Sequence, residues 1–144
     1  LPGINVQSGR TTVEIHDLRV QNFNNNSGIK GALNNGIVID SVEVVGNNTA
    51  AAGNNGGIYI DGPINGVTIN NVLSEGNRQR GIVIWNGHKA HITITNCTVR
   101  NNNCCGIELQ DGTASGVTRS GNTVEDQADS GMSAIGLTSG AGPN

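Results

Sequence analysis

A hydrophobic phrase returns along this chain about every 25 residues, and that period restricts the fold more than any other feature. The phrase alternates apolar and polar residues, as in Val-Thr-Ile-Asn-Asn-Val and Ile-Thr-Ile-Thr-Asn-Cys. Five copies, spaced by 24, 30, 25 and 25 residues, begin at Val13, Ile37, Val67, Ile92 and Val117. A second phrase, which starts with Gly-Ile, keeps step at Gly28, Gly57, Gly81, Gly106 and, more weakly, Gly131. Two phrases with one period indicate a supersecondary unit stacked on itself.

Each phrase has the apolar–polar alternation of a β-strand over three to five residues. Ile69 and Ile94 are expected to face inward, and Thr68 and Thr93 outward. Short connectors rich in Asn and Gly join the phrases, and no segment has a helical period. Parallel strands joined by short loops at a fixed period predict a β-solenoid. We expect one domain over residues 1–144, with coils starting near 13, 37, 67, 92 and 117 and a tail over 136–144.

The composition fits a narrow, repeated core. The chain has 22 glycines, as many asparagines, 13% charged residues and three aromatic residues. Disorder is the other interpretation of such a composition, but the regular apolar alternation argues against it. The net charge of −3 and the lack of any Lys or Arg run exclude an electrostatic nucleic-acid site. No apolar stretch approaches about 18 residues, so no membrane span is expected.

Two polar columns mark the bends of the predicted coils. The fifth position of the first phrase holds residues that tolerate left-handed corners: Asp17, Ser41, Asn71, Asn96 and Gly121. Farther along, Asn47, Asn77 and Asn102 recur with the same spacing, and stacked amides can bond from coil to coil. We expect Phe23 and Gln127 to interrupt this second ladder at its two ends.

The three cysteines do not predict a metal site. Cys97 stands where Val42 and Val72 stand in other coils, so it is read as a small buried hydrophobic residue. A Cys97–Cys104 disulfide is an alternative that the sequence leaves open. Zinc is not expected, because there is no C-x-x-C and no suitable His pair. The longer connector over 46–56 either lines a binding groove or is a plain surface excursion.

The phrases G-I-x-I and V-x-I-x-N resemble those of the right-handed parallel β-helix superfamily, the pectin-lyase-like fold, from Val13 to Thr138. The resemblance implies an all-β, right-handed parallel β-helix of about five coils. It also implies a polysaccharide partner and an extracellular, surface or virion-associated location. Five coils are few for this superfamily and neither end shows a cap. We therefore expect a segment of a longer β-helix, or self-association at the uncapped ends.

Outward columns of the Gly-Ile phrases carry the candidate chemistry. One column reads Lys30, Tyr59, Val83 and Glu108. The next reads Asp61, Trp85 and Gln110, with Asp111 just beyond. Exposed aromatic rings beside carboxylates are typical of sugar sites. Two coils separate Asp61 from Glu108, about 10 Å, near the upper end of the roughly 6.5–9.5 Å expected for inverting glycosidases. Solvated surface carboxylates would show the same spacing.

A cationic group flanks the Gly-Ile phrase that starts at Gly81, in the third coil, and comprises Arg78, Arg80, His88, Lys89 and His91. Such side chains could neutralise a uronate carboxylate or remove the proton beside it. The predicted catalytic residues are therefore Asp61, Glu108, His88 and Lys89. The predicted substrate-binding residues are Tyr59, Trp85, Arg80 and Gln110. No metal and no cofactor are predicted.

Two hypotheses for function follow. The first is a carbohydrate-associated β-helix, part of a polysaccharide lyase, epimerase or glycoside hydrolase that binds an acidic glycan along one face. The second is a non-catalytic structural or adhesive solenoid, such as a tailspike or surface-fibre segment. Asn86-Gly87-His88-Lys89 lacks the final glycine of the polygalacturonase Gly-His-Gly motif. The paired Asp motifs, the Asp-Pro-His motif and calcium-binding Asp clusters of relatives are also missing. Whether the chain is an enzyme therefore stays open.

Overall fold

The structure, a computed structural model, describes residues 1–50, 56–125 and 127, and the backbone of 132–137. Within these residues the secondary structure is entirely β, as the alternating pattern predicts. Every strand pair is parallel. The all-β prediction is thus confirmed.

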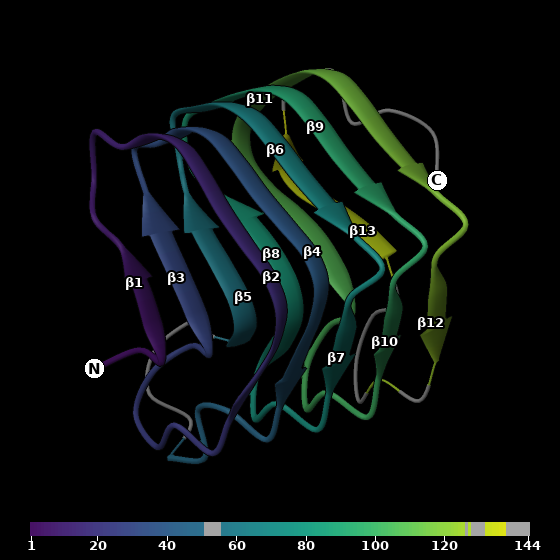
Figure 1. Cartoon of the computed structure of the whole chain (residues 1–144). Coiled ribbons are helices and arrows are strands. Elements are labelled where there is room, and N and C mark those ends of the chain that lie inside the picture. The colour runs from purple at the N-terminus through teal and green to yellow at the C-terminus, as the bar shows by residue number, and fades with distance from the viewer. Residues whose placement is uncertain (51–55, 126, 128–131, 138–144) are drawn as a thin grey trace.

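The strands form one continuous 13-stranded sheet that bends at its corners into three faces around one core (Figure 1), and we call these faces the first, second and third sheets. The first sheet consists of β1 (Ile4–Val6), β3 (Ile29–Ala32), β5 (Gly56–Asp61), β8 (Arg80–Trp85), the first half of β11 (Ile107–Ser120) and β13 (Met132–Leu137). The second consists of β2 (Thr11–Gln21), β4 (Asn35–Val45), β6 (Ile64–Asn70), β9 (His88–Thr95) and the second half of β11. The third adds β7 (Leu73–Glu75), β10 (Thr98–Arg100) and β12 (Thr123–Glu125) to the ends of β2 and β4.

Equivalent residues of successive coils face each other in register. Ile39 pairs with Ile69, and Ile69 with Ile94. This pairing continues through about five turns, so the chain is a parallel β-solenoid. Met132 pairs with Ile107 and extends the Gly-Ile column, whereas Gly131 lies outside the described residues. β13 runs to Leu137, and residues 138–144 of the predicted tail lie outside the described residues.

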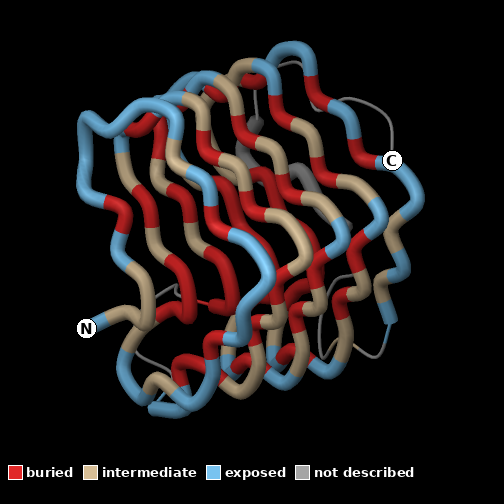
Figure 2. The backbone as a smooth tube through the Cα atoms, viewed as in Figure 1, coloured by how far each residue is buried: buried red, intermediate tan, exposed pale blue. Residues whose placement is uncertain are grey.

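The core is a stack of inward columns, as expected from the alternation. Ile69 and Ile94 are completely buried, whereas the neighbouring Thr68 and Thr93 are partly exposed. Figure 2 shows this as buried segments alternating with partly exposed ones along each strand. Burial of one such side chain contributes roughly 1.5–3 kcal/mol. Repetition of these columns therefore replaces the aromatic core that this chain lacks.

One inward column ends on a charged residue. Arg119 pairs with Ile94 and is 4% exposed. Burial lowers the pKa of its guanidinium. The 25-residue spacing assigns position 119 to the core, whereas the residue type alone would place an arginine at the surface.

The predicted corners between the second and third sheets are confirmed. Their backbone φ angles lie between +51° and +65° at Asp17, Ser41, Asn71, Asn96 and Gly121. Short polar side chains and glycine enter this left-handed region more readily than other residues. A second set of left-handed residues forms the corner between the first and second sheets and includes Leu33, Asn86 and Asp111.

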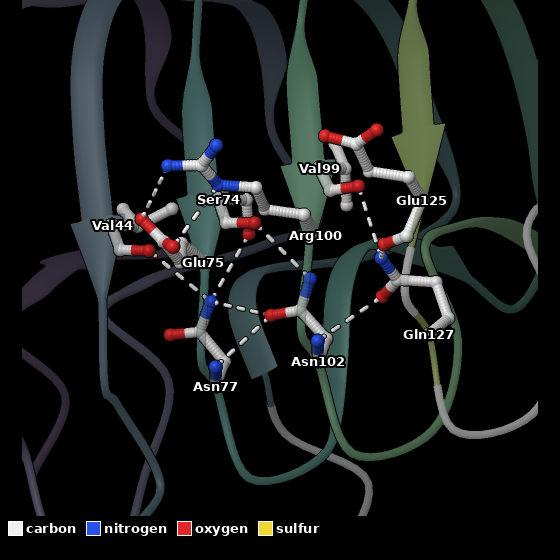
Figure 3. A network of polar contacts seen from close by, with 9 residues as sticks. All are labelled: Val44, Ser74, Glu75, Asn77, Val99, Arg100, Asn102, Glu125 and Gln127. Atoms are coloured by element: carbon white, nitrogen blue, oxygen red, sulfur yellow. Dashed lines mark hydrogen bonds and ion pairs between the residues drawn. The ribbon is translucent and has the colours of Figure 1, made fainter.

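The asparagine ladder between the third and first sheets is also present (Figure 3). The Asn77 amide nitrogen donates to the side-chain oxygen of Asn102 at 2.9 Å, and Asn47 donates to that of Asn77 at 3.2 Å. The prediction that Gln127 interrupts the ladder is wrong. Its side-chain oxygen accepts from the backbone N–H of Asn102 at 3.3 Å, so a glutamine reaches where an asparagine would. Phe23 does end the column, although its backbone N–H still donates to Asn47.

The cysteines separate as a buried thiol and a bonded pair. Cys97 is free and 1% exposed, in agreement with its expected place in the core. Cys104 is bonded to Cys105, so the alternative Cys97–Cys104 bridge is not formed. Of the long connector over 46–56, residues 51–55 lie outside the described residues, and its role as a groove wall stays a prediction.

Candidate functional site

The outer face of the first sheet brings together the two predicted outward columns. Tyr59 pairs with Val83, and Val83 with Glu108. In the adjacent column, Asp61 pairs with Trp85, and Trp85 with Gln110. We call the resulting surface the aromatic patch, and it comprises Lys30, Tyr59, Asp61, Arg80, Trp85, Asn86, Glu108, Gln110 and Asp111.

Two aromatic rings form the centre of the aromatic patch. The ring centroids of Tyr59 and Trp85 are 6.0 Å apart and their planes are tilted by 57°. The Lys30 ammonium lies 5.2 Å from the centroid of the Tyr59 ring. Tyr59 and Trp85 both remain partly exposed. Neighbouring coils therefore present two ring surfaces to a ligand from one side of the solenoid.

Arg80 crosses the patch and joins its two columns. Its Nε donates to the Glu108 carboxylate, and its Nη2 donates to Gln110 Oε1 at 3.5 Å. The guanidinium carbon also lies 5.4 Å from the centroid of the Trp85 ring. Because a guanidinium is planar, it can bond a carboxylate and stack on an indole at the same time. Arg80 thereby fixes the side chains of Glu108 and Gln110 next to the Trp85 ring.

Glu108 does not have the exposure expected of it. Its column faces outward, but the residue is only 1% exposed and its carboxylate is paired with Arg80, itself 9% exposed. The two-residue alternation along a strand predicts the direction of a side chain. It does not predict whether a side chain from a neighbouring coil covers it. In this arrangement Glu108 holds Arg80 in place, and its catalytic role remains a prediction.

Two other carboxylates bond groups of the patch. Asp111 Oδ2 accepts from the Trp85 indole N–H at 2.8 Å, and Asp61 Oδ1 accepts from Asn86 Nδ2 at 3.0 Å. Burial, and secondarily the charge of Asp61, raises the pKa of the Tyr59 phenol, while Arg80 opposes the shift. The phenol therefore remains a neutral donor at physiological pH. Together these groups supply hydrogen bonds at the rim of an apolar surface.

Lys89 lies inside the solenoid, which corrects the grouping of this residue with surface cations. It is 0% exposed and its Nζ donates to three backbone carbonyls, those of Asn86, Gly87 and Asp111. Burial lowers the pKa of the ammonium, opposed by the charges of Asp111 and Asp61. A lysine so placed cannot contact a substrate on the outer face without a change of structure.

His88 is exposed but lies round the corner from the patch, at the start of β9. Its Nδ1 is 2.6 Å from Thr113 Oγ1 and its Nε2 is 3.3 Å from Ser115 Oγ. A groove of about 450 Å³ next to it is also lined by Leu33 and Pro63.

The remaining cations do not join one cluster with Arg80. Arg78 is exposed in the segment before β8, and the His91 Nδ1 lies 2.8 Å from Asn65 Oδ1 on the second sheet. A second groove, of about 460 Å³, follows the corner between the second and third sheets. It is lined by Ser41, Val42, Glu43, Asn71, Val72, Leu73, Asn96, Thr98 and Arg100.

Sequence reasoning missed the parts played by Asn86, Asp111 and the interior Lys89. The coil spacing could have placed Lys89, because it lies 25 residues after Ile64 and 25 before Ala114, both of which are buried. No such signal marks Asn86 or Asp111, whose bonds depend on the side-chain conformations of their neighbours.

Within the described part of the chain, no three His, Cys, Asp or Glu side chains gather in a way that would hold a metal ion. The same residues include no helix with the length and apolar character needed to cross a membrane.

Comparison with known proteins gives one match. The family described as "Right handed beta helix region" matches residues 2–142, nearly the whole chain. No curated protein and no solved structure matches the chain significantly. The family match agrees with the parallel solenoid and adds its handedness, and it names no ligand.

Proposed function

The chain belongs to the right-handed β-helix family, and we propose that it binds a polysaccharide along the outer face of its first sheet. The observation that carries the proposal is the pair of rings formed by Tyr59 and Trp85, which are partly exposed and in contact on neighbouring coils. Aromatic rings cover the apolar faces of sugars, and surrounding polar groups bond the hydroxyls. Asp61, Gln110 and the Tyr59 phenol are suited to the second task.

The geometry supports binding more directly than catalysis. Glu108 is held by Arg80, and Lys89 is enclosed, so two of the four predicted catalytic groups are engaged within the protein. His88 is exposed and Asp61 is partly exposed. A lyase, epimerase or glycoside hydrolase activity is therefore tested together with binding. We also propose a location outside the cell, on a surface or on a virion.

An acidic glycan remains the favoured ligand class because Lys30 lies beside the Tyr59 ring. Arg80 contributes less to this preference than expected, since Glu108 already neutralises it. Lys30 would contact a uronate carboxylate while the rings hold the sugar. A neutral glycan would use the rings and hydroxyl-binding groups without Lys30.

Trp85 is the only tryptophan, so its fluorescence reports directly on the aromatic patch. We expect oligogalacturonate or oligomannuronate to change its emission in a saturable manner, and cello-oligosaccharide to serve as the neutral comparison. In calorimetric titrations, Trp85→Ala should raise Kd at least about tenfold, the equivalent of 1.4 kcal/mol. Leu18→Ala, which removes an exposed apolar side chain from the first coil, is the control and should leave Kd unchanged.

The same mixtures test for chemistry. New ultraviolet absorbance from unsaturated uronates would identify a lyase, and new reducing ends without that absorbance would identify a hydrolase. An inverted uronate stereocentre in the proton NMR spectrum, with neither product, would identify an epimerase. Binding without any of these three changes would leave a recognition surface. If no glycan binds, or if Trp85→Ala binds as the wild type does, the proposed face is wrong and the structural or adhesive solenoid is favoured.

A further inference from the structure

Lys89 occupies a position that the coil repeat reserves for an apolar side chain. It pairs with Ile64 of the preceding coil and with Ala114 of the next, which are 3% and 4% exposed. Lys89 itself is 0% exposed. The small Ala114 side chain leaves space in the column for the long lysine stem. An interior lysine needs compensation, since burial of an unpaired charge costs several kcal/mol or more.

Three backbone carbonyls provide that compensation. The ammonium donates to Asn86 O at 3.0 Å, to Gly87 O at 3.2 Å and to Asp111 O. An ammonium has three donors and no acceptor, so every donor is satisfied. Asn86 and Gly87 belong to the corner of one coil, and Asp111 belongs to the equivalent corner of the next. The lysine therefore connects two successive corners from the inside.

These corners are conformationally demanding. Asn86 and Asp111 are both left-handed, with φ angles of +55° and +57°. For residues other than glycine this conformation is sparsely populated, and it persists where the surrounding structure determines it. Carbonyls that converge on a cation are one such determinant. The Gly87 oxygen also accepts the backbone N–H of Thr113 at 3.3 Å, so the ammonium is its second donor. Without the ammonium, the Asn86 and Asp111 oxygens would lose their bonds to Lys89.

The outer side chains of the same two residues shape the aromatic patch. Asn86 donates from its side chain to Asp61, and the Asp111 carboxylate accepts the Trp85 indole N–H. Each residue thus faces Lys89 with its carbonyl and the patch with its side chain. The placement of Trp85 and Asp61 on the surface depends on the corner that Lys89 fixes within.

We propose that Lys89 is a positioning residue, a built-in cation that holds two successive corners and thereby orients Trp85 and Asp61 on the outer face. It replaces the bound metal or water that could otherwise satisfy three converging carbonyls. Its role in ligand binding rests on the proposed function, whereas its role in placing the indole does not.

The first test uses the single indole N–H resonance of the wild type and of Lys89→Met, which keeps an unbranched stem one atom shorter than that of lysine and removes the donors. We expect the resonance to move toward the position of a solvent-exposed indole, because Asp111 turns away. Ile64→Ala is the matched control. It removes methylenes from the same inward column one coil earlier and leaves the ammonium bonds intact, so the indole resonance should stay in place.

A second measurement needs no variant and applies even if Lys89→Met fails to fold. In the wild type, the Lys89 Nζ protons should exchange slowly with water and show couplings through hydrogen bonds to the carbonyl carbons of residues 86, 87 and 111. An ammonium that exchanges as fast as those of surface lysines would overturn the proposal. So would a folded Lys89→Met whose indole resonance is unchanged.

Glycan titrations separate this proposal from the one on function. If the wild type binds, folded Lys89→Met should show a Kd raised at least about fivefold, and Ile64→Ala a Kd close to that of the wild type. If the wild type binds no glycan, the indole and ammonium measurements still decide the role of Lys89. An unaltered Kd together with an altered indole would retain the positioning role and contradict its link to binding.

Discussion

Cys97 shows how little room a single core position leaves for chemistry. It occupies the column of Val42 and Val72 and is 1% exposed. Its Sγ lies 3.2 Å from the Thr95 carbonyl oxygen, and burial raises the pKa of the thiol to about 11. The thiolate is the reactive form of cysteine, so this residue is a packing element that happens to contain sulfur.

The raised thiol pKa predicts a specific loss of stability in alkali. The folded protein retains the proton up to about pH 11, whereas the ordinary value is 9.0. The stabilisation is therefore fully present below pH 9 and is lost as the pH rises through about 11. At 1.36 kcal/mol per unit, the wild type should lose roughly 2–3 kcal/mol more than Cys97→Val across this range. Urea unfolding of both proteins at several pH values measures the difference.

Valine is the appropriate replacement because two other coils carry it at this position. Groups that titrate in the same range, such as Tyr59, are common to both proteins and cancel in the comparison. Parallel stability curves for the two proteins would contradict the assignment of the shift to Cys97.

Residue by residue, the alternating pattern predicts direction better than environment. It correctly places Ile69 and Ile94 inside and Tyr59 and Trp85 outside. It misses the burial of Glu108, because cover from Arg80 depends on a side chain in another coil. It also misses Lys89, because the two-residue alternation along a strand is interrupted at a corner. The 25-residue repeat from coil to coil is not affected by the corner. The longer period is thus the more dependable guide.

At the scale of an element, the turn after the third sheet is held by amides instead of apolar contacts. The Asn77 side chain donates to Val44 O, Ser74 Oγ and Asn102 Oδ1 (Figure 3). It also accepts from the backbone N–H of Asn47. The spacing of asparagines predicts such a ladder, but the extension to Gln127 depends on the conformation of a longer side chain. Fully satisfied buried networks of this kind specify one arrangement of the backbone.

Removal of one amide from this ladder should affect both neighbouring turns. Asn77→Ala leaves the Val44 carbonyl and the Asn47 N–H without their buried partners, so we expect the free energy of unfolding to fall by roughly 2–4 kcal/mol. Chemical denaturation gives the value. Asn103→Ala, an exposed position in the following turn, should change it by less than about 0.5 kcal/mol. Equal effects of the two substitutions would show that the ladder does not stabilise the turns.

Across the whole molecule, stability should follow the stack. In solenoids each coil contacts its neighbours alone, so local opening depends on position. Most residues of β2 are exposed and it pairs with β4 on one side, whereas β6 and β9 lie between pairing strands and have buried inward positions.

Hydrogen exchange of the 144-residue polypeptide should reveal this gradient. Amides of β2 should exchange at least about 100-fold faster than those of β6 and β9. Fragment-resolved mass spectrometry measures both regions in one sample, with an unfolded sample as the reference for intrinsic rates. Uniform protection from β2 to β9 would indicate that the solenoid opens as a single unit.

The in-register columns also bear on how such a chain can change over generations. Asn71 and Asn96 are equivalent corners one coil apart, so in-frame loss or duplication of the stretch between them returns every column to its register. A gene can therefore gain or lose one coil while the corners that join the remaining coils keep their sequence. If the outer face binds a glycan as proposed, the binding surface would lengthen or shorten with the stack, and ligand length would become a heritable trait that varies in steps of one coil.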